Sequence, residues 1–280
     1  MKKTTYKAIY TVLICLFLTG CQFNDTNVSA NSASKESSTA DSEHLKYGIP
    51  SANGKLLYRT GYVALYDKEK KDPLWVSYHL TAGELNTPQL KRSNKFAPDP
   101  DLAIGERAEL YDYRNSGYDR GHMCPNADQA WSALTMKECF FLSNMCPQIH
   151  ALNAGEWEQL ESKVRDFTKK HGEVWIICGP VFNEPVKDGR TAEVKTIGSN
   201  KVWVPTDFYK IVAYENNVNK VEAVGFKMAQ ANLRGNLSSY VVKIRDIESL
   251  TGLDFFNKLP KTEDDRVETN RNITGEFWNN

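Results

Sequence analysis

Short apolar runs alternate with polar turns along the chain and predict two groups of β-strands. Residues 61–66 and 74–80 flank a charged turn and have the pattern of a β-hairpin. The second group consists of three further runs of strand-forming residues: 174–178, 208–214 and 221–228. Asn216 and Asn217 mark the turn between the last two runs.

A long helix is predicted between the two groups of strands, over residues 152–170. Its apolar side chains recur at intervals of three and four and share one face: Trp157, Leu160, Val164 and Phe167. His171 and Gly172 close this helix. Residues 247–256 form a second expected helix, before a charged, asparagine-rich tail. Strands in two groups around a helix-bearing central segment indicate a single α+β domain.

The first twenty residues have the pattern of an export signal. Lysines precede the apolar run 8–18, which is too short to span a membrane comfortably as a helix. The run ends in Leu-Thr-Gly-Cys, which resembles a bacterial lipobox. We therefore expect residues 1–20 to be removed and Cys21 to carry a lipid; a plain secretory signal or an uncleaved anchor is the alternative.

The rest of the chain divides by composition into a tether, a domain and a tail. Residues 21–50 are rich in Ser, Asn, Thr and Asp and hold too few large apolar side chains to fold, which is typical of a flexible tether. Residues 51–262 form the expected domain and residues 263–280 a polar tail. The whole arrangement predicts an extracytoplasmic protein, anchored by lipid to a bacterial membrane.

The charge and the cysteine content restrict the possible kinds of binding surface and cross-link, but they do not identify a function. The chain has 35 basic and 35 acidic residues, which argues against a wide basic surface for nucleic acid but allows a local basic groove. Four cysteines remain beyond Cys21, an even number for an exported protein: Cys124, Cys139, Cys146 and Cys178. Composition alone therefore does not reveal the chemistry.

Three closely spaced motifs do carry chemistry. Asp-Arg-Gly-His occupies residues 119–122, Ser-Asn-Met-Cys-Pro-Gln residues 143–148, and Asn-Ala-Gly-Glu-Trp-Glu-Gln-Leu-Glu residues 153–161. Together they supply a base, a guanidinium group, amide ligands and a carboxylate. This combination suits attack by a metal-assisted water on an anionic ester.

The three motifs, in this order and spacing, resemble the signature of the DNA/RNA non-specific endonucleases. This family of ββα-metal (His-Me finger) nucleases includes mitochondrial endonuclease G. The resemblance covers roughly residues 58–260. It implies a mixed or antiparallel sheet core with flanking helices and a ββα-metal element on its face. It also implies hydrolysis of phosphodiester bonds in DNA and RNA with one divalent metal, leaving 5′-phosphates; Mg²⁺ is the expected cofactor, with Mn²⁺ as a substitute.

The resemblance assigns roles to five residues of the motifs. His122 matches the general base, and Arg120, on the same face of a strand, would hold the phosphate. Asn153 matches the single metal ligand that the protein supplies, and Glu161 an outer-sphere partner of the metal. Asn144 would support the site from a strand.

Two further assignments complete the expected site. Arg92 approximately matches an upstream arginine that contacts phosphate in the family. Asp119 and Gly121 would point to the opposite face of the strand from Arg120, so we expect a structural role for Asp119. A base with an ordinary imidazole pKa would make activity fall below about pH 6.5.

Several of these residues also have a purely structural interpretation. A histidine in this context is often only packed in the protein, and Asn153 with Glu156 has the form of a helix N-cap box. Glu161 would then pair with Arg165 along a helix. The corresponding alternative function is a non-catalytic nucleic-acid-binding lipoprotein that retains a nuclease-like fold.

Cys124 and Cys146 each lie two residues beyond a candidate site residue. If their segments lie side by side, the two cysteines occupy equivalent positions and a disulfide between them is expected, with Cys139 as a competing partner. A zinc site could be drawn from the same two cysteines with His122 and His150, but it fits no common zinc spacing.

Overall fold

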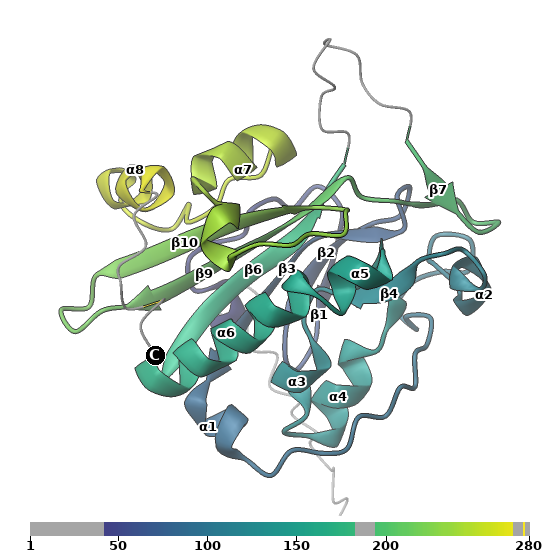
Figure 1. Cartoon of the computed structure of the whole chain (residues 1–280), viewed down its shortest axis with the longest axis horizontal. Coiled ribbons are helices and arrows are strands. Elements are labelled where there is room, and N and C mark those ends of the chain that lie inside the picture. Colours follow the sequence, from purple (N-terminus) through teal and green to yellow (C-terminus); the bar gives the residue numbers. More distant parts are fainter. Residues whose placement is uncertain (1–41, 183–193, 271–276, 278–280) are drawn as a thin grey trace, which may run out of the picture. The chain divides into compact units, whose positions relative to one another are not determined.

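An antiparallel sheet forms the centre of the computed structural model, which describes residues 42–182, 194–270 and 277 (Figure 1). In these residues the sheet has seven strands in the order β1-β2-β3-β6-β9-β10-β11. The strands are β1 (Lys55–Tyr58), β2 (Val63–Asp67), β3 (Asp72–Thr81), β6 (Glu173–Val181), β9 (Asp207–Glu215), β10 (Val221–Ala229) and β11 (Val241–Val242). Both predicted groups of strands are therefore confirmed, and they belong to one sheet.

The two groups meet where β3 pairs with β6, with Val76 opposite Cys178 and Thr81 opposite Glu173. The long segment between these neighbouring strands has to leave the sheet and return to it. It contains the elements α1 (Ala82–Asn86), α2 (Leu110–Tyr113), β4 (Asp119–His122), α3 (Asn126–Gln129), α4 (Ala133–Cys139), η3 (Leu142–Asn144), β5 (Met145–Gln148), α5 (His150–Asn153) and α6 (Glu156–His171). All three sequence motifs lie in this insertion.

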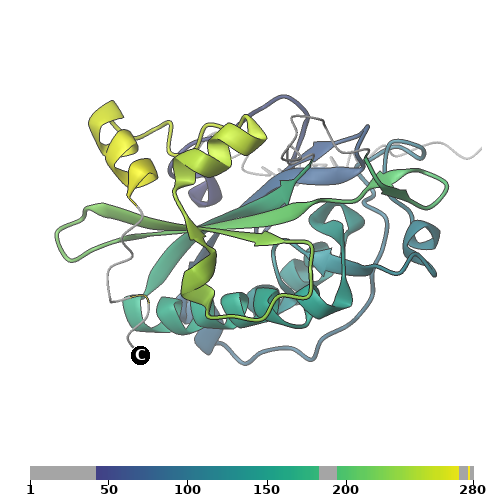
Figure 2. The same ribbon diagram turned by 45° about the horizontal axis from the view of Figure 1, so that its top comes forward.

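Side chains alternate between the two faces along each strand, so the sheet has apolar side chains on both faces, and both faces are covered. On β3, Val76 and Tyr78 face the α6 side, where they pack in one core with Trp157 and Leu160. Trp75 faces the other side and packs in a second core, beneath α7 (Ile244–Thr251) and α8 (Lys261–Thr269). Figure 2 shows α6 on one side of the sheet and the yellow C-terminal helices on the other.

The predicted long helix is interrupted near its start. Residues 150–153 form the single turn α5, and α6 begins only after Gly155. A Cβ at position 155 would collide with the carbonyl oxygen of Ala151, so this break requires glycine. The predicted apolar face is confirmed, because Trp157, Leu160 and the rest of the stripe are buried.

The C-terminal predictions need correction. The helix expected over residues 247–256 is α7, which begins at Ile244 and ends at Thr251, because Gly252 adopts a left-handed conformation with a φ of 70°. Residues 263–280 were expected to be only a polar tail. They include most of α8, whose Val267 is buried against the sheet.

The folded part also extends into the segment expected to be a tether. Leu45, in the short 3-10 helix η2 (Glu43–Leu45), and Tyr47 are buried in the core beneath α7 and α8. The remaining short elements are the hairpin β7 (Thr196–Ile197) and β8 (Val202–Trp203) and the 3-10 helix η4 (Leu237–Tyr240). The expected signal 1–20 and Cys21 lie outside the described residues.

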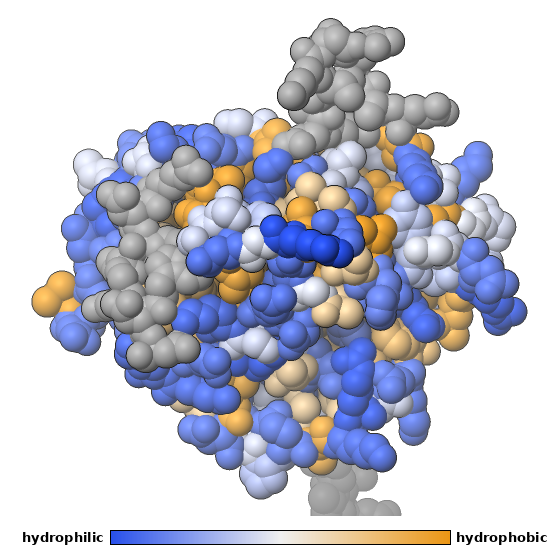
Figure 3. Space-filling view, in the orientation of Figure 1, coloured by the Kyte–Doolittle hydropathy of each residue, from blue (hydrophilic) through white to orange (hydrophobic). Residues whose placement is uncertain are grey.

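The surface in the view of Figure 3 is mostly hydrophilic, with hydrophobic residues placed between polar ones. Among the helices of the described ranges, none is both long and apolar enough to cross a membrane.

Shortening Leu160 should destabilise the protein, because this fully buried side chain fixes α6 on the sheet. We expect Leu160→Ala to lower the free energy of unfolding by about 2–5 kcal/mol, measured by urea denaturation. Leu134→Ala is the matched control, since Leu134 is 51% exposed in α4, and it should change the free energy by less than about 0.5 kcal/mol. Equal losses in the two variants would contradict the packing described here.

Candidate active site

A two-stranded antiparallel ladder of β4 and β5 carries the first two motifs. His122 lies opposite Met145, and Asp119 lies opposite Gln148. Gly121 is required in this ladder, because a Cβ at that position would collide with the side chain of Gln148. The chain continues from β5 through α5 into α6, so that two strands and a helix form the expected ββα element (Figure 1).

A cleft of about 480 Å³ opens beside this element, and basic and amide side chains dominate its polar lining. Its walls consist of Arg92, Phe96, Leu110, Tyr113, Arg114, Tyr118, Asp119, Arg120 and Asn153. The structure thus brings together three of the predicted site residues, Arg92, Arg120 and Asn153. Arg120 lies over the ring of Phe96, with 4.1 Å between the guanidinium carbon and the ring centroid. A local basic groove is therefore present in a chain that has no net charge.

His122 lies behind this cleft wall and is buried. Its ring contacts Phe96, at 5.6 Å between centroids, and Phe140, at 5.1 Å. Because Phe96 contacts both His122 and Arg120, the two motif residues share one face of β4, as predicted. Within the described structure, the Nε2 atom of His122 has no hydrogen-bond partner.

The surroundings of His122 favour the neutral imidazole. Burial, and then the positive charges of Arg92 and Arg120, lower the pKa of His122 to about 3. A neutral imidazole with an unpartnered nitrogen has the form of a proton acceptor. The expectation of an ordinary imidazole pKa is wrong, because that expectation took no account of the two arginines or of the aromatic rings.

Asn153 is oriented by Asp119. Its Nδ2 atom donates to Oδ2 of Asp119 at 2.9 Å, and Nδ1 of His150 donates to the same oxygen at 2.8 Å. A carboxylate only accepts hydrogen bonds, so the amide must turn its NH₂ group toward Asp119. The Oδ1 atom of Asn153 is left available to a ligand in the cleft.

This arrangement corrects two of the sequence-based interpretations. Asp119 does not point away from the site, since it lines the cleft and holds Asn153. Its expected structural role therefore becomes a positioning role at the site. The N-cap interpretation of Asn153 is also wrong, because Gly155 occupies the N-cap position of α6 and no side chain caps that end.

Asn144 lies in η3 rather than on a strand, and it is fully buried. Its Oδ1 accepts from the backbone nitrogen of Cys124 at 2.9 Å, and its Nδ2 donates to the carbonyl oxygens of Cys124 and Cys139 at 2.8 and 2.9 Å. Its amide is thus occupied by backbone groups. Asn144 supports the site by tying the end of β4 to the end of α4.

Glu161 lies on α6 and is not part of the cleft lining. Burial, opposed by the charge of Lys210 and reinforced by that of Asp128, raises its pKa to about 7. Arg165 donates to Oδ1 of Asp128 at 3.1 Å, and no ion pair between Arg165 and Glu161 is found among the described residues. Glu161 therefore does not form the expected pair with Arg165. It belongs instead to a group of charged side chains beneath α6 that includes Asp128 and Lys210.

The sequence analysis missed several residues that line the cleft or lie among the charged side chains beneath α6. Lys210 is fully buried, with its Nζ atom 4.6 Å from the ring centroid of Trp157, and a lysine inside an apolar strand pattern was the available signal. Phe96, Arg114 and Tyr118 line the cleft from irregular segments, where no periodicity marks them.

The predicted disulfide between Cys124 and Cys146 is wrong. All four described cysteines are free and buried. The two strands are antiparallel, so Cys146 lies opposite Gly121, whereas Cys124 follows the end of β4 near Asn144. An offset of three residues corresponds to about 10 Å along a strand, beyond the ~7 Å limit for a disulfide. The zinc alternative is not formed either: among the described residues, the groupings of metal-binding side chains include neither these cysteines nor His122.

The antiparallel sheet, the ββα element and the basic cleft with a neutral histidine define a nuclease of the ββα-metal class. The chain belongs to the DNA/RNA non-specific endonuclease family, whose profile matches residues 40–262. Members of this family depend on a divalent metal.

Three relatives and one solved structure illustrate the similarity. The chain is 34% identical to mitochondrial nuclease EXOG of Danio rerio over 78% of its length and 65% of the relative's, just under two thirds. It is 35% identical to nuclease C1 of Cunninghamella echinulata var. echinulata (77% and 88% covered) and 34% identical to human mitochondrial endonuclease G (76% and 73% covered). The crystal structure of an EndoG/EndoGI inhibitor complex is 32% identical, with a TM-score of 0.74 over 78% of this chain and 92% of that one.

Removing the Asp119 carboxylate should weaken metal binding, because the amide of Asn153 would lose the acceptor that orients it. We expect Asp119→Ala to raise the metal concentration for half-maximal cleavage by about 10–100-fold, as substitutions behind a metal ligand do. Asp119→Asn should have a smaller effect, since its side-chain oxygen can still accept. Asp166→Ala, at an exposed acidic position on α6, is the control. An unchanged metal requirement in Asp119→Ala would show that Asn153 is held by other contacts.

The acid limb of the pH profile should lie well below pH 6.5. Only the neutral form of His122 can accept a proton, and because its pKa is lowered to about 3, that form persists between about pH 5 and 8. Measurement of kcat/KM on a short oligonucleotide across this range should give a profile without a histidine step. A step with a midpoint near pH 6.5 would mean that His122 is solvated in the working enzyme.

Proposed function

We propose that this protein is a sugar-non-specific endonuclease that hydrolyses DNA and RNA with a histidine base and one divalent cation, leaving 5′-phosphate ends. The observation that carries the proposal is the grouping of three features, of which Arg120 and Asn153 line one cleft while His122 lies behind its wall. These are the neutral, unpartnered His122, the guanidinium of Arg120, and the amide oxygen of Asn153 directed away from Asp119.

The residues present fit a hard cation. Asn153 offers a neutral oxygen that is already oriented, and Mg²⁺ suits a site with few protein ligands because it retains several waters. We therefore propose Mg²⁺ as the cofactor, with Mn²⁺ as a substitute. When bound, the cation would stabilise the negative charge that develops on the phosphate and on the departing 3′ oxygen.

The side chains of the protein perform the remaining steps. His122 takes the proton of the attacking water, and burial keeps the imidazole neutral before this transfer. Arg120 holds two phosphate oxygens with its planar fork, and the ring of Phe96 beneath it fixes the guanidinium. Arg92, at the same cleft, would contact the phosphate from a second side. For Glu161, which lies on α6 outside the cleft lining, we propose an outer-sphere role toward the cation.

We further propose that the enzyme is exported and lipid-anchored outside the cytoplasm through Cys21. The support is the signal pattern of residues 1–20 with its lipobox-like end. Several relatives are named as mitochondrial, so this location would distinguish the present chain from them. Metabolic labelling with a fatty acid, compared between the native chain and Cys21→Ser, tests the anchor; equal labelling would exclude it.

Cleavage of plasmid DNA and of RNA should require both a divalent cation and His122. We expect activity with Mg²⁺ on both substrates, none in EDTA, and a loss of about 10²–10⁴-fold in His122→Ala, the range for a lost general base. His79→Ala is the control, because His79 stacks on Trp175, a residue of the core beneath α7 and α8. Nucleic-acid binding without cleavage by the native chain would instead favour the non-catalytic alternative.

A further inference from the structure

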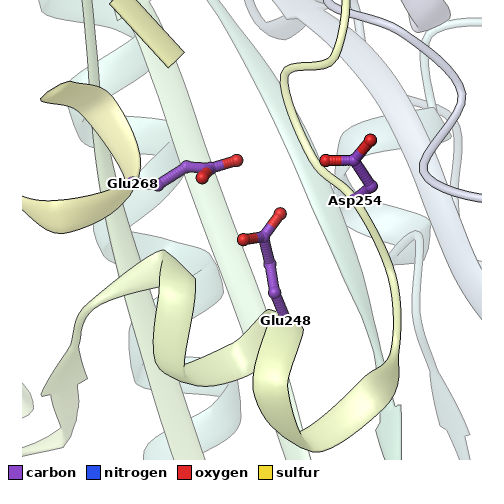
Figure 4. A group of neighbouring side chains, drawn as sticks. All are labelled: Glu248, Asp254 and Glu268. Atoms are coloured by element: carbon purple, nitrogen blue, oxygen red, sulfur yellow. The ribbon is translucent and has the colours of Figure 1, made fainter. Parts of the chain in front are cut away.

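A cluster of carboxylates lies on the side of the sheet opposite α6, between α7, α8 and the loop that joins them. Glu248 comes from α7, Asp254 from the loop and Glu268 from α8, and Figure 4 shows the three side chains pointing toward one another. Their oxygen atoms lie within 4.8 Å of one another. Asp264 and Asp265, one turn earlier on α8, form a second group with Glu268.

Glu268 is the unusual member, because its side chain is only 1% exposed. One oxygen, Oε2, pairs with Arg245 at 2.5 Å, but no hydrogen-bond donor from the described residues reaches Oε1. Oδ1 of Asp264 is also buried and has no hydrogen-bond donor among the described residues. Leaving buried carboxylate oxygens without a partner is costly, so each of them calls for a cation or a proton.

The neighbouring cationic side chains do not balance this charge. Arg245 also pairs with Asp265 at 2.7 Å, and Lys261 pairs with Asp264 and Asp265 at 2.8 and 3.0 Å. The carboxylate of Asp254 has no hydrogen bond or ion pair within the described part of the chain. Arg245 also reaches Glu248, with 3.5 Å between its Nε atom and Oε2, and the second oxygen of Glu248 accepts from the backbone nitrogen of Phe255 at 2.8 Å. Five carboxylates therefore share two cationic groups, and the unbalanced charge is concentrated at Asp254 and at Oε1 of Glu268.

We propose that Glu248, Asp254 and Glu268 form a structural binding site for a divalent cation, with Ca²⁺ as the ligand. Oxygen atoms on opposite sides of a Ca²⁺ ion, each bound at about 2.3–2.6 Å, are separated by roughly the spread seen here. Mg²⁺ requires shorter distances and stricter octahedral geometry. Asp254 is exposed, so water can complete the coordination from that side.

A shared proton is the competing way to relieve the same repulsion. Burial and the neighbouring carboxyl groups of Asp264 and Glu248 raise the pKa of Glu268 well above its usual range. A cation would replace this proton and join α7, the loop and α8 into one unit. The catalytic cleft lies in the insertion on the α6 side, so the two cation sites are independent.

Calcium titration of the whole chain, after removal of metal with a chelator, tests the proposal by calorimetry and by thermal unfolding at pH 7. The native protein should bind Ca²⁺ and unfold several degrees higher in its presence. Asp254→Asn should weaken this binding by about tenfold or more and abolish most of the thermal shift, because charge count sets affinity at such sites. Glu248→Gln should behave in the same way.

Asp246→Asn is the matched control, since Asp246 is an exposed acidic residue of α7 outside the cluster. It should retain the calcium response of the native chain. Any Ca²⁺ bound at Asn153 is common to all of these variants, and each should still cleave plasmid in saturating Mg²⁺. A native calcium response in both Asp254→Asn and Glu248→Gln would overturn the proposal. So would stabilisation by acidification alone with no response to Ca²⁺, which would assign the site to a shared proton.

Discussion

The active centre depends on the antiparallel pairing of β4 with β5. This short ladder places Arg120 and His122 on one face and directs Asp119 toward the turn α5 that follows β5. The backbone contacts of Asn144 hold the far end of the ladder against α4. The ladder is in turn fixed to the sheet, because α6 continues directly from α5 and buries its apolar face against β3 and β6. The packing of α6 on the sheet therefore both stabilises the core and holds the site residues in position.

Electrostatics in this site is a matter of local placement rather than of overall composition. The chain carries equal numbers of acidic and basic residues, yet arginines gather on the cleft walls. Their charges serve two purposes: they attract an anionic substrate, and they disfavour protonation of His122. The aromatic rings of Phe96 and Phe140 strengthen the second effect, because they pack against the imidazole and its burial disfavours the charged form. An imidazole that is kept neutral in this way requires no carboxylate partner to maintain that form.

The parts that sequence predicted correctly are those governed by periodicity or by local motifs. The strands and the apolar face of α6 follow from patterns within single segments, whereas the grouping of Arg92, Arg120 and Asn153 was implied by the resemblance to the endonuclease family. The errors arose where a long-range or backbone contact decides the structure. The break at Gly155 depends on the carbonyl oxygen of Ala151, and the separation of Cys124 from Cys146 depends on strand direction. No pattern within one segment indicates that Asp119 meets Asn153, because that contact joins residues 34 positions apart.

The two faces of the sheet carry groups of opposite charge, and the groups lie in separate parts of the fold. The α6 side concentrates positive charge around a cleft that is open to solvent and available to a polyanion. The other side concentrates negative charge between two helices, partly out of reach of water. The sheet of the described residues and the apolar cores on its two faces lie between these groups, so the two groups are separated in space. A cation bound between the C-terminal helices would thus leave the geometry of Arg120, His122 and Asn153 unchanged.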